Sequence, residues 1–494
     1  MDNAISSLTD YLPRYAQRKG AFPHHPQDSP RRARRLLDLL GAPDRQFVVV
    51  RVIGTKGKGS TAVILAAVLQ AAGYSVGLYT SPHLHSPRER IQVNRVPIAR
   101  AAFAAGLRAL HKLLLGSLEW DDLGPATLFE GLTALAAAHF AQRGADLAIF
   151  EAGMGGRSDA THAFSPILTL LTPIALDHQA YLGNTLEAIA IEKFGAVPPG
   201  GVVISAPQVE AVQAIVAARG KEVGARLQWS AGPHPGAVRS DQRASGTQRE
   251  KGGRAGLQGP HQAVNTSLAL AAVEALRERG WKIPEEAVAS GLQSVHWPGR
   301  LEVVAGRPLT LVDAAHNPAA AAGLAAALAE GQFQGRQSPM PAPNEAQEPP
   351  LRPRILLVGC SADKDLAGIV APLAPIADGV VLTQAHHYRA VAPEEMALLW
   401  QHHSAPSTLS PSSTDRALGA ASSQATPGSV EGVPVEVVPE VASALRRARA
   451  WAGPAGLVCA CGSFFVVAEV REALGLAVRE PWLEPVGGDK AKRR

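Results

Sequence analysis

Cysteine is scarce in this sequence, and so are long apolar runs and any strong excess of one charge. The 494 residues include three cysteines, too few for a framework of disulfide bonds, so we expect a reducing compartment. Cys459 and Cys461 are one residue apart inside an apolar run, a spacing that is poor for zinc and ordinary for a buried strand. The cysteine content therefore excludes a small disulfide-stapled secreted domain.

No apolar stretch approaches the roughly 20 residues that a membrane-spanning helix needs. The most apolar windows resemble TAVILAAVLQAAG, and the first twenty residues lack the apolar core of a signal peptide. The formal net charge is +5, a mild excess that suits anionic ligands without requiring nucleic acid. We therefore expect a cytoplasmic protein that binds small molecules and has no membrane or nucleic-acid partner.

The densest basic run is PRRARRLLDLLG, residues 30–41. Such a run suits either a nucleic-acid surface or the solvated face of an amphipathic helix. Its leucines recur at helical spacing, which favours a helix whose arginines lie in solvent.

Hydrophobic residues make up 46% of the sequence and charged residues 18%, as in a globular protein, and 494 residues are too many for one ordinary core. Apolar strand patterns alternate with helix patterns, which predicts a doubly wound, mostly parallel α/β sheet with ligands at the carboxyl ends of its strands. The predicted strands lie within residues 47–54, 75–80, 146–153, 167–178 and 200–206, and the predicted helices are 58–72, 127–142 and 185–194.

A second strand–helix alternation begins at Leu309 and predicts a smaller α/β domain. A Pro-Gly pair, Pro298-Gly299, precedes this second alternation and is typical of a break between domains. We therefore expect a first domain over residues 1–298 and a second over 299–494. Segments rich in Gly, Pro, Ser or Ala without apolar periodicity are expected to be loops or mobile insertions, namely residues 232–260, 332–353 and 403–432.

Residues 48–73, VVVRVIGTKGKGSTAVILAAVLQAAG, have the pattern of a strand, a glycine-rich turn and a helix. The turn departs from the common phosphate loop G-x-x-x-x-G-K-[ST], because Gly59 follows Lys58 and the hydroxyl comes only at Ser60. Its glycines still allow backbone N–H groups to approach an anion at the positive end of the helix. A tight turn that binds nothing is the alternative, and the lysine between glycines favours a phosphate site.

Three other predicted strands end in residues that suit a metal–triphosphate site. Ser81 follows a strand in LYTSPHL, Glu151 ends one in LAIFEAG, and His178 follows one in PIALDHQAYLG. A carboxylate in such a place often holds Mg²⁺. Each residue alone has an ordinary explanation, as a turn hydroxyl, a solubilising acid, and a capping or core histidine. Together with Lys58 they predict one site at a sheet edge.

Residues 184–195, NTLEAIAIEKFG, predict a helix that opens with Asn184 and Glu187 in capping-box spacing. The helix closes with Lys193, whose charge suits the carboxyl end of a helix. A lysine paired with solvent or with Glu192 would satisfy this pattern.

These segments jointly resemble one family, the folylpolyglutamate synthases and dihydrofolate synthases of the Mur-ligase superfamily, which form amide bonds with ATP. The matching motifs are GTKGKGST, GLYTSPHLHSPRERI, EAGMGGRSDAT, LDHQAYLGNTLEAIAIEKFGAVPPG, HQAVNTSLALAA, WPGRLE, DAAHNP, SADKD and GSFFVVAEV, in family order. The resemblance implies a Mur-ligase-like ATPase domain with a phosphate loop of this type, a smaller Rossmann-like domain after it, and a bacterial bifunctional enzyme.

The resemblance also implies roles for individual residues. ATP is bound by Gly57, Lys58, Gly59, Ser60, Asn265, Arg300, Asp313 and His316. Two Mg²⁺ ions are bound by Ser81, Glu151, His178 and Lys193, the last as a carbamate. The pterin-bearing substrate lies at Thr127, Phe129, Ser158, Asp159 and Ala160. Catalysis is expected to depend on Lys58, His178 and Lys193.

The implied reaction adds L-glutamate to dihydropteroate, to the γ-carboxylate of a folate, or to both. ATP first converts the acceptor carboxylate to an acyl phosphate, and Lys58 with the metal ions neutralises the developing charge. The amine of glutamate then displaces phosphate, and closure of the second domain keeps water out. We expect a monomer.

Some segments depart from the family pattern. Lys56 replaces a common Asn, Ser158 replaces a Leu, Ser29-Pro30-Arg31-Arg32 replaces Gly-Leu-Glu-Arg, and HHYRA replaces a Pro-Arg-Ala stretch. Two other functions stay open, a Mur-type ligase of cell-wall precursors and a non-catalytic nucleotide-binding module. The first usually carries an extra amino-terminal domain, whereas about 45 residues precede the first strand here. The second needs no residues for a second metal ion.

Overall fold

The computed structural model describes residues 26–116, 123–124, 126–232, 256–331, 351–404 and 433–480. The chain forms two units, of which unit 1 is Met1–Pro298 with Ala477–Arg494 and unit 2 is Gly299–Leu476. Residues 477–480, which the prediction assigns to the second domain, group with unit 1. The predicted insertions, and most of the predicted loop over residues 232–260, lie largely outside the described residues.

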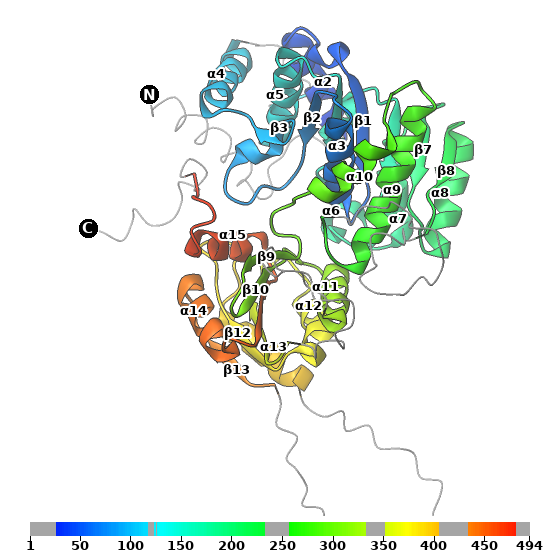
Figure 1. Cartoon of the computed structure of the whole chain (residues 1–494). Coiled ribbons are helices and arrows are strands. Elements are labelled where there is room, and N and C mark those ends of the chain that lie inside the picture. The colour runs from blue at the N-terminus through cyan, green and yellow to red at the C-terminus, as the bar shows by residue number, and fades with distance from the viewer. Residues whose placement is uncertain are drawn as a thin grey trace, which may run out of the picture. The chain divides into compact units, whose positions relative to one another are not determined.

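Unit 1 is built on an eight-stranded sheet in the order β4-β3-β2-β5-β1-β6-β7-β8, of which Figure 1 labels β1, β2, β3, β7 and β8. The strands from β2 to β8 in this order are parallel, and β3 and β4 extend the sheet as an antiparallel edge. The strands are β1 (Val48–Ile53), β2 (Val76–Tyr79), β3 (Ile91–Val93), β4 (Val96–Pro97), β5 (Leu147–Glu151), β6 (Leu168–Leu171), β7 (Val202–Ser205) and β8 (Arg226–Trp229). The α-helices are α2 (Ser29–Leu39), α3 (Lys58–Ala71), α4 (Arg100–Gly116), α5 (Leu128–Gln142), α6 (Gln179–Leu182), α7 (Leu186–Phe194), α8 (Glu210–Glu222), α9 (Pro260–Arg277) and α10 (Glu285–Ser294).

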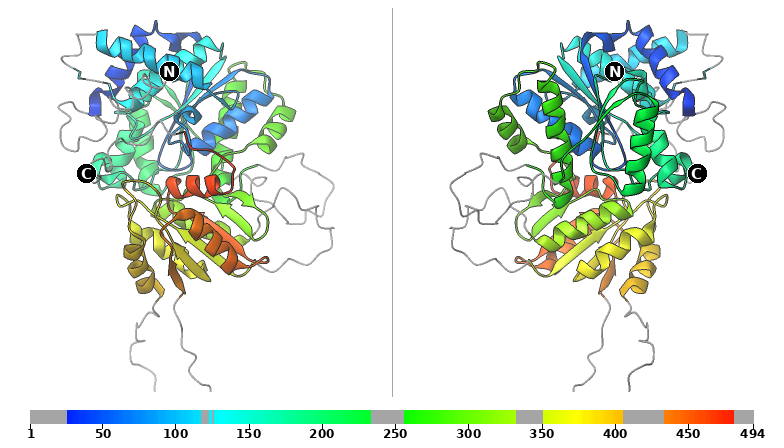
Figure 2. Two further views of the ribbon diagram at one scale, coloured as in Figure 1. Left: turned by 90° about the vertical axis from the view of Figure 1, so that its left-hand side faces the viewer. Right: turned by 90° about the vertical axis from the view of Figure 1, so that its right-hand side faces the viewer.

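Helices cover both faces of this sheet, so its central strands are apolar on both sides (Figure 2). In β5, Leu147 and Ile149 pack into one core with α3, α9 and α10. The alternate residues Ala148 and Phe150 pack into a second core with α2, α4 and α5. This two-sided burial explains the continuous apolar runs that predicted a parallel sheet.

Four neighbouring strands carry the predicted site residues to one edge of the sheet. In the order β2-β5-β1-β6 all four strands are parallel, so their carboxyl ends lie on the same side. Ser81, Glu151, Lys58 and His178 follow or end these strands in that order. The topology therefore gathers the four residues where ligands of such sheets bind.

Unit 2 is a smaller α/β unit on a six-stranded sheet in the order β13-β12-β11-β14-β10-β9, in which only β9 is antiparallel. The strands are β9 (Glu302–Ala305), β10 (Leu309–Val312), β11 (Arg354–Val358), β12 (Gly379–Leu382), β13 (Val435–Val437) and β14 (Leu457–Cys461). The helices are α11 (Pro318–Glu330), α12 (Leu366–Leu373), α13 (Pro393–Ser404), α14 (Val441–Ala452) and α15 (Phe464–Ala473). Cys459 and Cys461 are buried thiols in β14, as predicted for a core strand. The two mostly parallel sheets confirm the predicted fold class.

The predicted solvation of the basic helix is wrong for one of its arginines. Arg32 of α2 is 5% exposed, and its guanidinium donates from Nε to Glu130 Oε2 (3.0 Å) and from Nη2 to Glu130 Oε1 (2.9 Å). This ion pair joins α2 to the start of α5. A basic run in a sequence can therefore contain a buried, paired arginine as well as solvated ones.

The predicted cap of helix α7 is also wrong by one residue. The N-cap is Thr185, whose Oγ1 accepts a hydrogen bond from the Ala188 N–H (3.1 Å), and Asn184 precedes it. Threonine and asparagine both cap helices, so sequence spacing alone does not separate the two.

Candidate active site

The turn between β1 and α3 has the backbone of an anion-binding site. Gly57 is the N-cap of α3 and has a φ of +82°, a left-handed conformation that favours glycine. The N–H groups of Thr55 and Lys56 donate to the Pro173 carbonyl (3.1 and 3.2 Å), which fixes the turn against the end of β6. The first N–H groups of α3 have no carbonyl of their own helix to bind, so the positive end of a 14-residue helix lies at the turn.

Two glycines of this turn permit contacts that a side chain would block. A Cβ at Gly57 would lie 2.0 Å from Asn265 Oδ1, so the amide of α9 sits directly against the turn. A Cβ at Gly59 would lie 3.3 Å from Glu151 Oε2 and 3.4 Å from Trp297 Nε1. The glycine that breaks the common phosphate-loop pattern therefore leaves room for the Glu151 carboxylate beside the start of the helix.

We expect the Gly57→Ala substitution to weaken ADP binding by about tenfold or more, a change of about 1.4 kcal/mol. The added methyl group would displace Asn265 from the turn. Gly73→Ala is the matched control, because Gly73 has a φ of +93° and nothing lies within 4 Å of an added Cβ. Both variants carry the strain of a left-handed alanine, about 1–3 kcal/mol. Calorimetric titration with ADP should separate them, and equal losses of affinity would contradict the assignment.

Glu151 and Ser81 are brought together at the ends of β5 and β2. Glu151 is 5% exposed, and its Oε2 accepts a hydrogen bond from the Ser81 N–H (2.9 Å). Burial lowers the pKa of the neighbouring Arg90, and Tyr79 and Glu151 oppose that shift. The buried Glu151 carboxylate is therefore within electrostatic reach of the Arg90 guanidinium, and it is hydrogen-bonded to a serine whose hydroxyl could also bind a ligand.

Lys193 lies in the last turn of α7 and is 3% exposed, so the alternative of a solvated lysine is wrong. Burial and the positive charge of Lys58 lower its pKa to about 7. Three carboxylates oppose this shift, those of Asp177, Asp159 and Glu192. The amine therefore lies within electrostatic reach of the phosphate-loop lysine, and a large share of it is neutral at pH 7.

His178 is the N-cap of α6, with a φ of +50°. Its N–H donates to Asp177 Oδ1 (2.9 Å), and its Nε2 lies 3.9 Å from the same oxygen. Burial lowers the pKa values of Lys193 and Lys56, and the negative charge of Asp177 opposes both shifts. The structure thus adds Asp177 and Lys56 to the predicted site. Their sequence signals are the position next to His178 and the position inside the phosphate loop.

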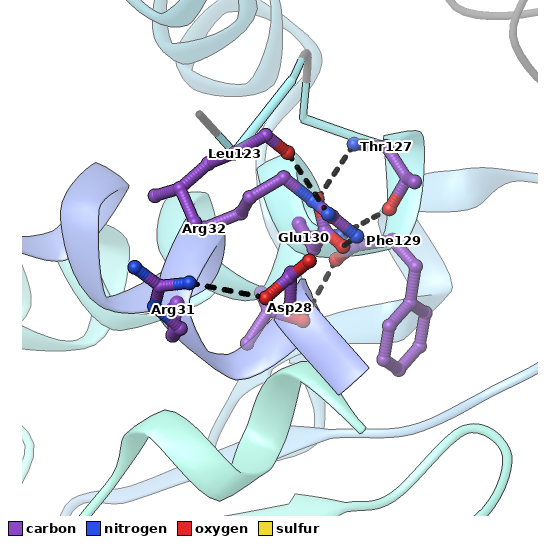
Figure 3. A network of polar contacts seen from close by, with 8 residues as sticks. Asp28, Arg31, Arg32, Leu123, Thr127, Phe129 and Glu130 are labelled. Atoms are coloured by element: carbon purple, nitrogen blue, oxygen red, sulfur yellow. Dashed lines mark hydrogen bonds and ion pairs between the residues drawn. The ribbon is translucent and has the colours of Figure 1, made fainter. Parts of the chain in front are cut away.

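Thr127 and Phe129, two of the residues predicted at the pterin, lie at the start of α5. Thr127 caps the helix, because its Oγ1 accepts from the Glu130 N–H (3.3 Å) while its own N–H donates to Glu130 Oε2 (2.7 Å). Figure 3 shows Arg32 directed at the same Glu130 carboxylate. A Cβ at Gly153 would lie 2.6 Å from Phe129 Cζ, so the ring packs against the segment that follows Glu151.

Ser158, Asp159 and Ala160, the other residues predicted at the pterin, form the loop after β5. The Ser158 N–H and Oγ donate to Glu192 Oε1 (2.9 and 2.5 Å), which ties the loop to α7. Buried Asp159 accepts from the N–H groups of Gly153 and Met154 (2.9 and 3.1 Å). Burial raises its pKa, and hydrogen bonds to the carboxylate oppose that shift. The loop is therefore hydrogen-bonded both to α7 and to the segment that follows Glu151.

The residues predicted to bind ATP from unit 2 gather at the carboxyl ends of β10 and β14. Asp313 is buried and accepts from the N–H groups of Leu301 (2.8 Å) and Ala315 (2.9 Å). The Phe464 ring lies 5.2 Å from the His316 ring and 4.8 Å below the Arg300 guanidinium. Asp313 thus holds the turn after β10, while His316 and Arg300 flank one aromatic ring.

No family model matches the chain, but relatives of known function do. The chain is 36% identical over 389 residues to a dihydrofolate synthase/folylpolyglutamate synthase of Mycobacterium tuberculosis, covering 74% of this chain and 75% of the relative. It is 32% identical over 457 residues to a probable bifunctional folylpolyglutamate synthase/dihydropteroate synthase of Haloferax volcanii. That match covers 90% of this chain and 48% of the relative, so the chain spans about half of the longer protein.

Solved structures give the same result at the level of the fold. A folylpolyglutamate synthase of Mycobacterium tuberculosis complexed with ADP and AMPPCP has a TM-score of 0.76 at 30% identity, covering 96% of this chain and 98% of the other. A bifunctional folylpolyglutamate synthase/dihydrofolate synthase of Yersinia pestis complexed with AMPPNP and a manganese ion has a TM-score of 0.71 at 27% identity, covering 95% and 98%.

Proposed function

Since this chain belongs to the family of folylpolyglutamate synthases and dihydrofolate synthases, we propose that it uses ATP to join L-glutamate to dihydropteroate, to the γ-carboxylate of a folate, or to both. It is a ligase of folate metabolism, and family membership removes the cell-wall ligases from consideration. The observation that carries the proposal is the meeting of the phosphate loop, the Ser81–Glu151 pair and buried Lys193 at one sheet edge.

The nucleotide phosphates bind the turn of Gly57, Lys58, Gly59 and Ser60 in this proposal. The turn offers backbone N–H groups, a helix amino terminus and one lysine amine to a polyanion. Asn265 contacts the same nucleotide from α9, where it lies against Gly57. The contribution of Arg300, Asp313 and His316 of unit 2 stays a prediction from the family resemblance.

The donor set suits a divalent metal ion that also binds the phosphates. Within the described residues, no group of three or more His, Cys, Asp or Glu side chains could hold a metal by itself. Mg²⁺ fits this arrangement, because it usually binds one or two carboxylates together with substrate phosphates and water. Glu151 and Ser81 would hold the first ion, and His178 and Lys193 a second. The ions would supply positive charge to the transferring phosphoryl group.

Lys193 would serve the second ion as a carbamate. An uncharged amine is the form that captures CO₂, and the lowered pKa of Lys193 supplies it near pH 7. The carbamate places an anion beside Lys58, which removes the repulsion that adds to burial in lowering the pKa of Lys193. The low pKa and the burial of the side chain support this part of the proposal.

The acceptor would lie between the start of α5 and the loop after β5. The partly buried Phe129 ring packs against the buried Tyr79 ring (centroids 5.7 Å apart, planes tilted by 50°) and offers an apolar face for a pterin. Thr127 and the loop of Ser158, Asp159 and Ala160 complete the predicted contacts.

A monomeric state is part of the same proposal, as is a cytoplasmic location, which the low cysteine content suggests. Within the described ranges, no helix has the length and apolar character needed to cross a bilayer.

Transfer of oxygen from substrate to phosphate tests the proposed chemistry. The acceptor carboxylate is labelled with ¹⁸O and incubated with the enzyme, ATP, Mg²⁺ and glutamate. An acyl phosphate leaves one labelled oxygen in the phosphate that is released, because the amine displaces that phosphate from the carbonyl carbon. Unlabelled phosphate would contradict the mechanism, and the absence of glutamate-dependent turnover would favour the non-catalytic nucleotide-binding alternative.

A further inference from the structure

The last described residues form a segment that belongs to unit 1. Residues 477–480 follow α15 of unit 2 along the chain, yet they group with unit 1. The Glu480 carboxylate accepts hydrogen bonds from Ser86 Oγ (2.6 Å) and from Arg88 Nε and Nη2 (3.0 and 2.5 Å). The Glu480 N–H donates to the His85 carbonyl (3.2 Å). The segment is therefore bound through both its backbone and its only acidic side chain.

The partner of this segment is the β2–β3 loop, residues 80–90. Within the loop, the Glu89 carboxylate accepts three backbone hydrogen bonds, from the N–H groups of Leu84, His85 and Ser86 (2.8, 3.0 and 2.9 Å). The loop begins at Ser81, whose N–H binds the Glu151 carboxylate. Glu89 thus binds the backbone of residues 84–86, and Glu480 binds the side chains of Ser86 and Arg88.

The ion pair of Glu480 and Arg88 is placed to stabilise the conformation of the loop. The two side chains are 18% and 24% exposed, so solvent screens their attraction less than that of a fully exposed pair. Arg88 Nη1 also donates to the Ile98 carbonyl (2.9 Å), beyond β4, which anchors the guanidinium at a second point. Removal of the carboxylate would leave Ser86 and Arg88 without the acceptor that now joins them.

We propose that residues 477–480 act as a positioning strap, in which Glu480 holds the β2–β3 loop in the conformation that sets Ser81 against Glu151. Glu480 is not among the residues proposed to bind substrate or metal, so its effect passes through Ser86, Arg88 and the loop. A segment at the far end of the chain thereby contributes to the geometry of the metal–phosphate site. This inference rests on the proposed function only for its kinetic consequence.

Amide hydrogen exchange of the full-length protein tests the strap without requiring turnover. In Glu480→Ala, exchange of the amides of residues 84–86 should accelerate by about tenfold, the factor expected for loss of a charge-assisted hydrogen bond. Glu480→Gln, which keeps the shape but loses the charge, should give a smaller acceleration. The matched control is Glu436→Ala, which removes the Glu436–Arg447 pair of unit 2 (Oε2–Nε 2.6 Å) and should leave this loop unchanged.

Steady-state kinetics test the positioning role. Glu480→Ala should raise the KM for Mg-ATP by about three- to tenfold with a smaller change in kcat, because the loop must be ordered again on binding. Unchanged exchange in Glu480→Ala would overturn the strap. Faster exchange with an unchanged KM would overturn the positioning of Ser81. A wild-type enzyme without ligase activity would refute the proposed function, and the exchange result would still decide the strap.

Discussion

Substitution of Lys58 by alanine is expected to reduce turnover by about 10²–10³, the usual cost of removing one charge-stabilising contact in a transition state. Lys58 is the first residue of α3, and its Nζ lies 3.4 Å from the Thr55 carbonyl, above the turn that would hold the phosphates. The side chain is half-buried at the site and is not part of a hydrophobic core. The loss should therefore fall on kcat while the fold is retained.

Phosphate release at saturating substrates and thermal unfolding together check this prediction. Lys221→Ala is a suitable control, because Lys221 is an exposed lysine in the last turn of α8. Full activity of the Lys58→Ala enzyme would refute the assignment of the phosphate loop. Loss of the fold together with activity would show that the lysine is structural.

Lys193→Ala should be nearly inactive, with a loss comparable to that of Lys58→Ala. A lysine with an ordinary pKa of about 10.4 is uncharged in fewer than about one molecule in 10³ at pH 7. With a pKa of about 7, about half of the Lys193 amines are uncharged at that pH. Because the carbamate forms from the uncharged amine, activity at fixed CO₂ should rise as the pH increases through 7 and fall as it decreases.

Chemical rescue separates a carbamate from a simple positive charge at this position. Acetate should partly restore Lys193→Ala, because its carboxylate can occupy the place of the carbamate. Lys193→Arg keeps the charge but forms no carbamate, so it should stay inactive. A carbamate carbon should be detectable by ¹³C NMR in wild-type protein supplied with ¹³CO₂. A bare amine in a high-resolution map with ATP and Mg²⁺ bound would contradict the proposal.

The alternation of apolar strands and amphipathic helices predicted the regular part of the fold well. The observed β1 lies inside the predicted residues 47–54, and the predicted helix over residues 58–72 ends one residue beyond α3. The sheet edges were not predicted. The outer strand β4 has two residues and β8 reads RLQW, so neither contains the apolar run of a strand buried on both faces.

The site was predictable where its residues follow strands, because parallel topology alone brings such residues to one edge. Burial and long-range pairing were not predictable in this way. Arg32 binds Glu130, 98 residues along the chain, and only packing of α2 against α5 brings the two together. The carboxylates that act on Lys193 likewise include Asp159 and Asp177 of the loops after β5 and β6, which local helix patterns do not reveal.

A comparison of acceptors tests the central claim most directly. Phosphate release is measured with ATP, Mg²⁺ and L-glutamate while dihydropteroate, reduced folates and UDP-linked peptides are offered in turn. The account predicts glutamate-dependent release with dihydropteroate, with reduced folates or with both, and none above background with UDP-linked peptides. Release that requires a UDP-linked peptide, or that is independent of any acceptor, would contradict it.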